Sequence, residues 1–357
     1  MILITGATGH VGNNLLRSLS KKGETLRLFL QPQESVGALD GTHFDLVVGD
    51  IRNPEDVNRA VEGCEKVYHL AGLVDIAPKQ VNLLEEVNVL GTRNIVEACL
   101  KYNVKRLVFI SSVHALPESP KGSKLKELGA AAFPNTTLLG AYAVSKSKAT
   151  AEVYKGVEKG LDAVMIFPSG IIGPYDHRGS QMGSVLKTLL KAKNMKTYPC
   201  FKGGYNFVDV RDVVIALQLA MEHGRSGEGY LITGHSITIP ELFQLVARWM
   251  GKTTIKLILF PLWLVKFAAR IVVKFARLFN KKTFFTPYSI EVLDSNSDMD
   301  HSKAVKELGF KPRPLEETIN DTLKWFSNHL NNYKQKKTKH HRTKTKIRKR
   351  SKHINVA

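Results

Sequence analysis

Residues 2–19 read ILITGATGHVGNNLLRSL, and this stretch decides the fold of the chain. Its first three residues are apolar, which suffices for a short buried strand. A glycine-rich segment, 5–12, follows at once, and leucines then recur at helical spacing, at positions 15, 16 and 19. The order of strand, glycine turn and helix is typical of a dinucleotide site.

The three glycines of this turn have separate roles. Gly6 allows the tight turn, Gly9 lets the backbone approach a pyrophosphate, and Gly12 lets the helix pack closely on the strand. We therefore expect a dinucleotide whose phosphates lie at the N-terminus of the helix, where backbone N–H groups lack partners. The alternative is a structural turn that binds no ligand.

The composition indicates a large globular protein with two basic features. The chain has 357 residues, 43% of them hydrophobic, which is enough for a large core and two lobes. Residues 334–357 carry eleven Lys and Arg and no acid, and residues 252–282 carry eight and no acid. These two stretches account for 19 of the 20 net positive charges, so the globular body is nearly neutral.

Cysteine usage bears on the compartment. The three cysteines, at 64, 99 and 200, are odd in number and far apart, so we expect neither a disulfide framework nor a metal site. This usage favours a reducing, cytoplasmic compartment. A strand that begins at Ile2 leaves no room for a signal peptide, which would need a charged region and a longer apolar stretch.

Four further segments read as strands: 25–30, 44–48, 66–70 and 105–110. They alternate with helical segments of about 10–20 residues, which predicts an α/β fold with a doubly wound parallel sheet and right-handed crossovers. In such a sheet the ligand lies beyond the carboxyl ends of the strands.

Residues that end these strands are candidate cofactor contacts. Gln31 ends the second strand, where a carboxylate would hydrogen-bond the 2′-hydroxyl of NAD and an arginine would accept the 2′-phosphate of NADP. Gln31 is neither, and because a carboxylate is absent we favour NADP, with NAD left open. Asp50 is either an adenine contact or the cap of a helix that begins at Pro54. His69 is interpreted as a structural hydrogen-bonding residue rather than a catalyst.

The candidate catalytic residues follow the fifth strand. Ser111 and Ser112 lie at its carboxyl end, and Tyr142 and Lys146 share one face of a later helix because they are four residues apart. An ammonium near a phenol lowers the pKa of the phenol, so we expect Tyr142 to exchange a proton with a carbonyl or alcohol oxygen. Ser112 would hydrogen-bond the same oxygen while nicotinamide supplies a hydride. A plain surface Tyr–Lys pair is the alternative.

Over residues 1–330 the sequence resembles the extended short-chain dehydrogenases/reductases, also called the NAD-dependent epimerase/dehydratase family. The matching motifs are TGATGHVG (5–12), GDIR (49–52), HLAG (69–72), FISS (109–112), YAVSK (142–146), PSGIIGP (168–174) and FVDVRDV (207–213). Within the family it is most similar to dihydroflavonol 4-reductase-like and 3β-hydroxysteroid dehydrogenase-like members. Gln31 and Phe167 depart from arginines that are common in relatives.

The resemblance implies a Rossmann fold with a smaller C-terminal substrate lobe. It implies Ser112, Tyr142 and Lys146 as the catalytic triad, with Lys146 also holding the nicotinamide ribose. It places the cofactor, NADP or NAD, against these residues: Gly6, Thr8, Gly9, His10, Val11, Gly12, Gln31, Asp50, Ile51, Leu70, Ala71, Gly72, Asn88, Ser111, Tyr142, Lys146, Pro168, Ser169, Gly170 and Ile171.

The predicted organisation has three parts. Residues 1–167 form the dinucleotide-binding domain, to which 206–223 return as strand and helix. Residues 168–330 form the substrate lobe, in which 230–232 is a strand and Pro240 lies in the first turn of a helix. Residues 331–357 form a disordered basic tail.

Residues 255–279 are the unusual part of the substrate lobe. Their longest uncharged run, 257–265, is too short to span a bilayer, which takes about 20 residues. Basic residues form one stripe on the expected helix: Lys266, Arg270, Lys274 and Arg277. Apolar residues lie elsewhere around it: Trp263, Phe267, Ile271, Phe275 and Leu278. The pattern suits peripheral contact with a membrane surface, and the alternative is a lobe helix with one solvated face.

The basic tail has two interpretations. Its Lys and Arg residues suit non-specific binding to anionic lipid or nucleic acid through counterion release. No aromatic residue follows Tyr333, which argues against sequence-specific RNA binding. A solubilising tail is the alternative.

These observations favour an NAD(P)-dependent dehydrogenase or reductase that acts on a hydrophobic ketone, aldehyde or secondary alcohol. A nucleotide-sugar epimerase or dehydratase is the first alternative; it needs a diphosphate site, for which Arg178, Lys187 and Lys191 are the candidates. A non-catalytic dinucleotide-binding scaffold is the second, and the intact triad argues against it. We expect a small-molecule substrate, and a homodimer is a further candidate assembly.

Overall fold

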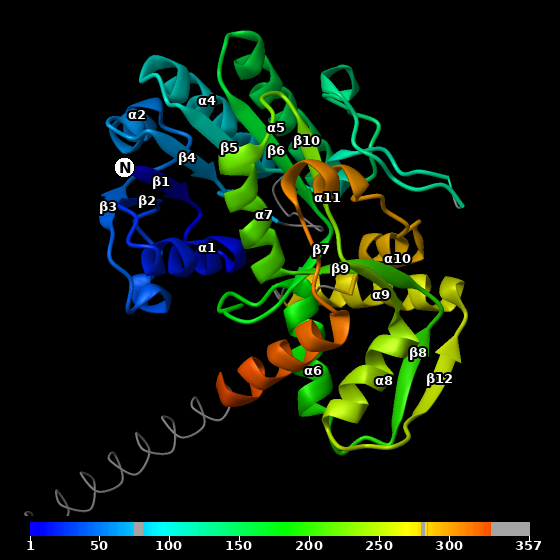
Figure 1. The fold of residues 1–357 in the computed structure, drawn as a ribbon. Helices are drawn as coiled ribbons and strands as arrows, with labels where there is room; N and C mark the ends of the chain where they lie inside the picture. Colours follow the sequence, from blue (N-terminus) through cyan, green and yellow to red (C-terminus); the bar gives the residue numbers. More distant parts are fainter. Residues whose placement is uncertain (75–80, 121, 280–282, 284, 330–357) are drawn as a thin grey trace, which may run out of the picture.

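The computed structural model describes residues 1–74, 81–120, 122–279, 283 and 285–329. The centre of this part is a parallel sheet of seven strands in the order β10-β6-β5-β4-β1-β2-β3 (Figure 1). The strands are β1 (Ile2–Thr5), β2 (Leu26–Leu30), β3 (Asp45–Val48), β4 (Lys66–His69), β5 (Arg106–Ile110), β6 (Ala163–Pro168) and β10 (Gly229–Ile232). All neighbouring pairs are parallel, so the doubly wound sheet is confirmed.

Helices cover both faces of this sheet, and the alternation of side chains along each strand serves both layers. On one face, Ile2 and Ile4 pack with α1 (His10–Lys21), α7 (Val210–His223) and α11 (Ser302–Leu308). On the other face, Leu3 packs with α2 (Pro54–Val61), α4 (Gly91–Lys101) and α5 (Ala141–Glu158). A short α3 (Val81–Leu84) and a π-helical segment (Glu85–Leu90) lead into α4. Single 3₁₀ turns occur at Val36–Leu39, Val113–Ala115 and Ala130–Ala132.

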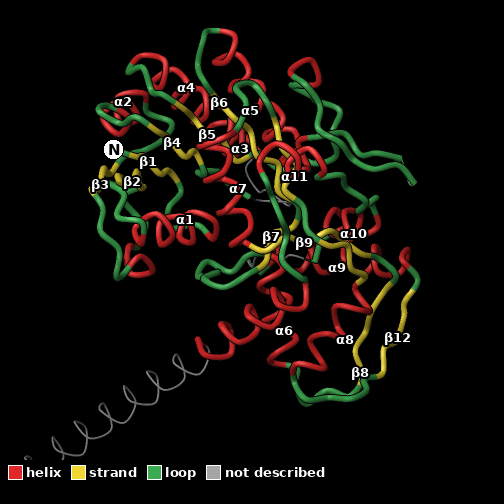
Figure 2. The backbone as a smooth tube through the Cα atoms, viewed as in Figure 1, coloured by secondary structure: helices red, strands yellow, loops and turns green. Residues whose placement is uncertain are grey.

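The remaining elements gather on one side of the central sheet (Figures 1 and 2). They include a three-stranded sheet of β7 (Gly170–Ile172), β9 (Gly204–Asp209) and β11 (His235–Thr238), and a parallel pair of β8 (Thr197–Phe201) and β12 (Lys256–Phe260). Four helices accompany these strands: α6 (Gln181–Lys191), α8 (Ile239–Trp249), α9 (Leu262–Leu278) and α10 (Pro287–Asp294). A last helix covers 315–329.

The start of α8 is fixed by side chains. The Thr238 hydroxyl accepts from the Glu241 N–H and the Glu241 carboxylate accepts from the Thr238 N–H, which forms a capping box. Pro240 lies in the first turn of this helix, as predicted. In the last helix Ile319, Leu323 and Phe326 are fully buried and form its apolar face.

Two parts of the sequence interpretation need correction. The segment that ends at Asp209 pairs with β7 and β11 rather than with the central sheet, so only α7 returns to that sheet. Tyr230, which the sequence placed in the substrate lobe, instead lies in β10, the edge strand of the central sheet beside β6. A four-residue strand carries no signal of which sheet it joins, because pairing depends on contacts far along the chain.

Among the described residues, no helix combines the length and the hydropathy needed to cross a bilayer.

Candidate active site

The glycine-rich turn connects β1 to α1. Gly6 has φ +70°, and a Cβ there would lie 2.7 Å from the backbone N of Ala71. A Cβ on Gly12 would lie 2.2 Å from the carbonyl oxygen of Gly6. Gly9 precedes the first residue of α1 and has no side chain that could cap the helix, so the N–H groups of the first turn face outward. The fold therefore requires glycine at positions 6 and 12.

One cavity of about 840 Å³ extends from this turn into the smaller set of elements. Most of the predicted cofactor residues line it: Gly6, Gly9, His10, Val11, Gly12, Leu70, Gly72, Ser111, Tyr142, Lys146, Pro168, Ser169, Gly170 and Ile171. The others lie outside its lining: Thr8, Gln31, Asp50, Ile51, Ala71 and Asn88. The structure therefore brings together residues from four separate strand ends.

Some of the remaining candidates have structural partners. Asp50 accepts hydrogen bonds from the Arg52 backbone and guanidinium, which hold the pKa of its carboxyl below the usual range. The cap of α2 is Asn53, so the alternative in which Asp50 caps that helix is wrong. Asn88 accepts from the Leu73 N–H at 2.7 Å and donates to the Ser145 hydroxyl at 3.0 Å.

His69 has the structural role that the sequence suggested. Its ring lies fully buried between two hydroxyls, with Thr5 Oγ1 2.8 Å from Nδ1 and Thr92 Oγ1 3.0 Å from Nε2. Burial lowers its pKa to about 3, so the ring is neutral at physiological pH. The Thr5 hydroxyl also accepts from the N–H groups of Leu70 and Ala71, which ties the end of β4 to β1.

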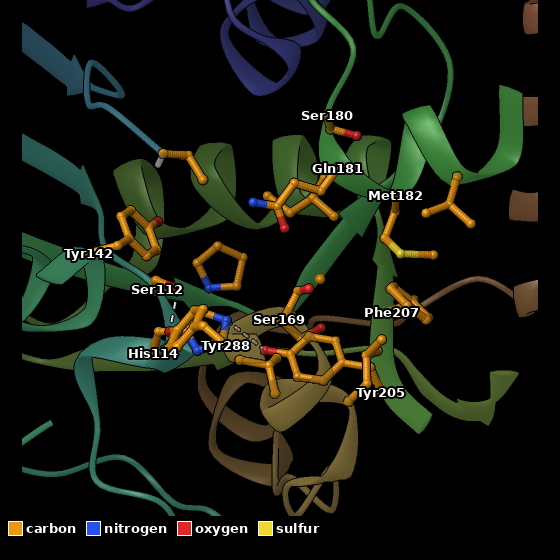
Figure 3. A pocket seen from close by; sticks show the side chains of 18 of the residues that line it. Ser112, His114, Tyr142, Ser169, Ser180, Gln181, Met182, Tyr205, Phe207 and Tyr288 are labelled. Atoms are coloured by element: carbon orange, nitrogen blue, oxygen red, sulfur yellow. Dashed lines mark hydrogen bonds between the residues drawn. The ribbon is translucent and has the colours of Figure 1, made fainter. Parts of the chain in front are cut away.

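The three predicted catalytic residues meet at the carboxyl end of β5, and Figure 3 shows Ser112 and Tyr142 there. Ser112 and Tyr142 both line the cavity, and the Ser112 hydroxyl accepts a hydrogen bond from the His114 N–H at 3.2 Å. Lys146 lies one turn further along α5, where its Nζ donates to the carbonyl oxygen of Ile110 at 2.7 Å and lies 4.5 Å from the Phe109 ring centroid. Ser111 differs from Ser112 because its hydroxyl pairs with Thr150 at 2.7 Å. The geometry therefore favours Ser112 as the serine beside Tyr142.

The pKa expectation for Tyr142 needs correction. Burial raises the pKa of Tyr142 to about 12, and the nearby Ser112 hydroxyl offsets only part of this effect. Burial also lowers the pKa of Lys146 to about 7, so its ammonium is only partly charged near neutral pH. The spacing of Tyr142 and Lys146 was visible in the sequence, but the loss of solvent around both groups was not.

The Lys146 shift leads to a stability prediction. Between about pH 7 and 10.5 the unfolded chain binds one proton more than the folded chain, so the free energy of unfolding rises with pH in this window. Between about pH 7 and pH 9.5 we expect the free energy of unfolding of the cofactor-free wild type to rise by roughly 3 kcal/mol because of this lysine. The Lys146→Met variant should lack this contribution. Urea titrations at both pH values measure it. Lys148→Met, on the same helix but paired with Glu85 near the surface, is the control and should keep the wild-type slope.

The loop after β7 connects the substrate side to the glycine-rich turn. The carbonyl oxygen of Pro174 accepts hydrogen bonds from His10 Nε2 at 3.0 Å and Asn14 Nδ2 at 3.2 Å. Arg178 donates to the Thr8 hydroxyl and to the Glu34 carboxylate. This loop therefore lies over the turn that is expected to hold the cofactor phosphates.

The sequence profile of the NAD dependent epimerase/dehydratase family matches residues 2–233. The chain belongs to this family. The chain is similar to a protein named sterol demethylase protein B from Methylococcus capsulatus, with 34% identity over 91% of this chain and 97% of that protein. A putative dihydroflavonol 4-reductase from Synechocystis is 30% identical over 91% of this chain and 94% of its own length. The crystal structure of gox2253 superposes with a TM-score of 0.77 at 29% identity, over 92% of this chain and 98% of that one.

As a member of the epimerase/dehydratase family, this chain is an enzyme, an NAD-dependent oxidoreductase of the extended short-chain type. The cavity fits the cofactor. A Cβ on Gly72 would lie 3.3 Å from Asn88 Oδ1 and 4.0 Å from Lys146 Nζ, so this glycine leaves room beside the lysine. The glycine-rich turn and the N-terminus of α1 line the other end.

Three residues of the site escaped the sequence analysis. His114 stacks on Tyr205 with the ring planes 10° apart, and Tyr205 Oη lies 3.0 Å from His114 Nε2 (Figure 3). Tyr288 of α10 lies near the same histidine, with ring centroids 6.5 Å apart. Burial lowers the pKa of His114 to about 4, so it stays neutral. The sequence could have indicated His114, because it follows Ser112 by only two residues. Tyr205 and Tyr288 come from distant segments in which nothing pointed to the active site.

Proposed function

We propose that this enzyme transfers hydride between a nicotinamide cofactor and a secondary alcohol or ketone on a hydrophobic, ring-bearing lipid such as a sterol. The observation that supports the proposal is the wall of the cavity beyond Tyr142. Lys146 is the only Lys, Arg, Asp or Glu among the described residues that line the cavity. Apolar side chains form most of the far end: Met182, Val185, Phe201, Phe207, Phe243, Phe260, Leu264, Val265, Phe285, Ile290, Val292 and Leu293.

The apolar lining of the cavity does not favour the alternative function, that of a nucleotide-sugar epimerase. A buried diphosphate needs cationic or N–H partners. Of the sequence candidates, Arg178 contacts Thr8 and Glu34, and the Lys187 Nζ lies 4.5 Å from the Phe326 ring centroid; neither these two nor Lys191 lines the cavity. The name of the Methylococcus relative, a sterol demethylase protein, supports a sterol-like substrate.

In the proposed reduction, a nicotinamide cofactor, when bound, would supply the hydride for the carbonyl carbon of the substrate. Tyr142 donates its phenolic proton to the carbonyl oxygen, so that a C–H and an O–H bond form together. The Ser112 hydroxyl hydrogen-bonds that oxygen and holds it beside Tyr142. Lys146, whose pKa lies near neutrality, stabilises the tyrosinate that remains. The apolar wall excludes water from the reacting atoms.

A substrate panel tests the proposal. With NADPH or NADH present, we expect steady oxidation of the cofactor with a 3-ketosteroid and no consumption or epimerisation of UDP-glucose. Absorbance at the nicotinamide band measures the first, and chromatography of the sugar nucleotide measures the second. Turnover of UDP-glucose without net cofactor oxidation would contradict the proposal and favour the epimerase.

For the cofactor we propose a preference for NADPH over NADH. The support is local: Gln31 provides no carboxylate at the end of β2, and Arg178 reaches Thr8 of the adjoining glycine-rich turn. In Arg178→Ala we expect the KM for NADPH to rise about 10-fold, the effect of one lost charged hydrogen bond, while the KM for NADH stays within about twofold. Arg59→Ala, which removes another exposed ion-paired arginine, is the control. If the KM for NADPH and the KM for NADH rose equally in Arg178→Ala, a role of Arg178 at the 2′-phosphate would be contradicted.

Two partner hypotheses extend the proposal. We propose that residues 255–279 contact a membrane surface, because a lipid-like substrate partitions into bilayers. The tail from 331 onward lies outside the described residues, and its contact with anionic lipid or nucleic acid, like a homodimer, stays a prediction.

A further inference from the structure

Part of the surface formed by β12 and α9 is apolar and exposed; we call it the docking face. On α9 the exposed members recur every three or four residues and so share one side of the helix: Trp263, Phe267, Ile271, Phe275 and Leu278. Trp263 is 69% exposed and Leu278 75% exposed. On β12, Ile258, Leu259 and Phe260 are exposed as well. Large aromatic and aliphatic side chains gathered in this way mark an interaction surface.

A basic stripe adjoins the docking face along α9. Lys266, Arg270 and Lys274 each follow an exposed apolar residue by three positions, so the two stripes run side by side. The side chain of Arg277, the fourth predicted member, is outside the described part of the chain. Lys266 has an acidic neighbour, Glu291, at 3.7 Å, but no Asp or Glu occurs anywhere between 252 and 282. Apolar insertion beside cations suits a bilayer with anionic headgroups.

The side of α9 that adjoins the docking face belongs to the substrate cavity. Val265 and Ala269 are buried and pack with Ile290 of α10 in a small separate core. Leu264, Val265 and Ala268 line the cavity that ends at Tyr142. One helix thus carries the cavity lining and the docking face on adjoining sides.

Phe260 contacts both the substrate cavity and the exposed surface. It lines the cavity and is also 39% exposed, at the point where β12 ends and α9 begins. An apolar path therefore runs from the exposed surface, past Phe260, to the hydroxyls of Tyr142 and Ser112. A sterol that left a bilayer by this path would not have to cross water, which removes the cost of hydrating its apolar surface.

We propose that the docking face binds the surface of an anionic lipid bilayer and that the hydrophobic substrate passes from the bilayer into the cavity beside Phe260. The entry route rests on the proposed function, whereas the docking does not. A second copy of the chain is a poorer occupant, because a two-fold contact through this face would bring the basic stripes of both copies together.

The test uses the full chain and the double variant Phe267→Glu/Phe275→Glu, which alters exposed residues that do not line the cavity. The matched control is Ile215→Glu/Val305→Glu, which adds the same charges at two exposed apolar positions on α7 and α11. Flotation is measured with vesicles of phosphatidylserine and phosphatidylcholine. Salt of about 0.5 M screens charge-only binding, including that of the basic tail, while apolar insertion persists.

We expect wild type and control to float and the double variant to lose at least about 10-fold of the bound fraction. A second variant, Arg270→Gln/Lys274→Gln, should weaken binding at low salt to phosphatidylserine vesicles but not to vesicles of phosphatidylcholine alone. Failure of wild type to float, or equal flotation of the Glu double variant, would overturn the docking. A shift of the double variant from dimer to monomer in solution, with no flotation of wild type, would assign the face to a second copy instead.

Entry is tested with one 3-ketosteroid delivered in two forms. We expect the double variant to lose at least about 10-fold in kcat/KM for steroid embedded in vesicles, and to match wild type for steroid carried by cyclodextrin. Equal losses in both forms would overturn the entry route. No turnover by wild type in either form, with the flotation difference intact, would overturn the proposed function and the entry route but leave the docking standing.

Discussion

Replacement of Tyr142 by phenylalanine is expected to lower kcat by about 10²–10⁴-fold, the usual contribution of a positioned general acid. The phenylalanine ring keeps the place of Tyr142 in the cavity wall, so only the phenolic proton donor is lost. Dinucleotide binding should change by less than about threefold. Single-turnover kinetics with a deuterated cofactor measure the chemical step directly.

Tyr154→Phe is the matched control for this variant. Tyr154 lies on the same helix, is also buried, and stacks on Phe133 at a centroid distance of 5.6 Å, away from the cavity. Its variant should keep kcat within about twofold. If both variants retained wild-type turnover, a group other than Tyr142 would have to donate the proton to the substrate. His114 and Tyr205 would be the next residues to replace.

The second large effect is expected at Gly12. An alanine Cβ there would lie 2.2 Å from the Gly6 carbonyl oxygen and 2.7 Å from the Ala7 Cα, so the turn and the start of α1 must move apart. We expect the free energy of unfolding to fall by about 3 kcal/mol. Because the helix N-terminus moves away from the phosphates, the Kd for NADPH should rise about 100-fold, which is the loss of one or two charged hydrogen bonds. Urea titration and fluorescence titration measure the two quantities.

Gly129→Ala is the control, since that glycine has φ −76° and no atom within 4 Å of its added Cβ. It should leave both quantities unchanged. A Gly12→Ala variant that bound NADPH with wild-type affinity would show that the turn does not hold the phosphates.

The sequence predicted what depends on local spacing. The glycine-rich turn, the alternating strands and the Tyr142–Lys146 pair are each set within a few residues, and the strand ends agree with the structure to within one residue. The pairing of Tyr230 with Ile166 depends on residues 64 positions apart, which spacing does not reveal. The same holds for the raised pKa of Tyr142, because burial is a property of the whole fold.

The substrate end of the cavity was the least predictable part. Its wall combines Val185 of α6, Phe207 of β9, Leu264 of α9 and Leu293 of α10. Each of these residues reads as an ordinary core residue in its own segment. What makes them a site is that together they enclose a space, and this emerges only when the elements pack. By contrast, the basic stripe on α9 was visible in the sequence because a helical period suffices to define it.

The position of α9 between cavity and surface has an evolutionary consequence. Adjacent residues of a helix point about 100° apart, so Phe267 faces outward while Ala268 lines the cavity. Substitutions on the inner side change which molecules fit, and those on the outer side change what the enzyme adheres to. Selection can therefore alter substrate range and attachment separately within one helix, and descendants of a common ancestor can differ in one trait while they share the other.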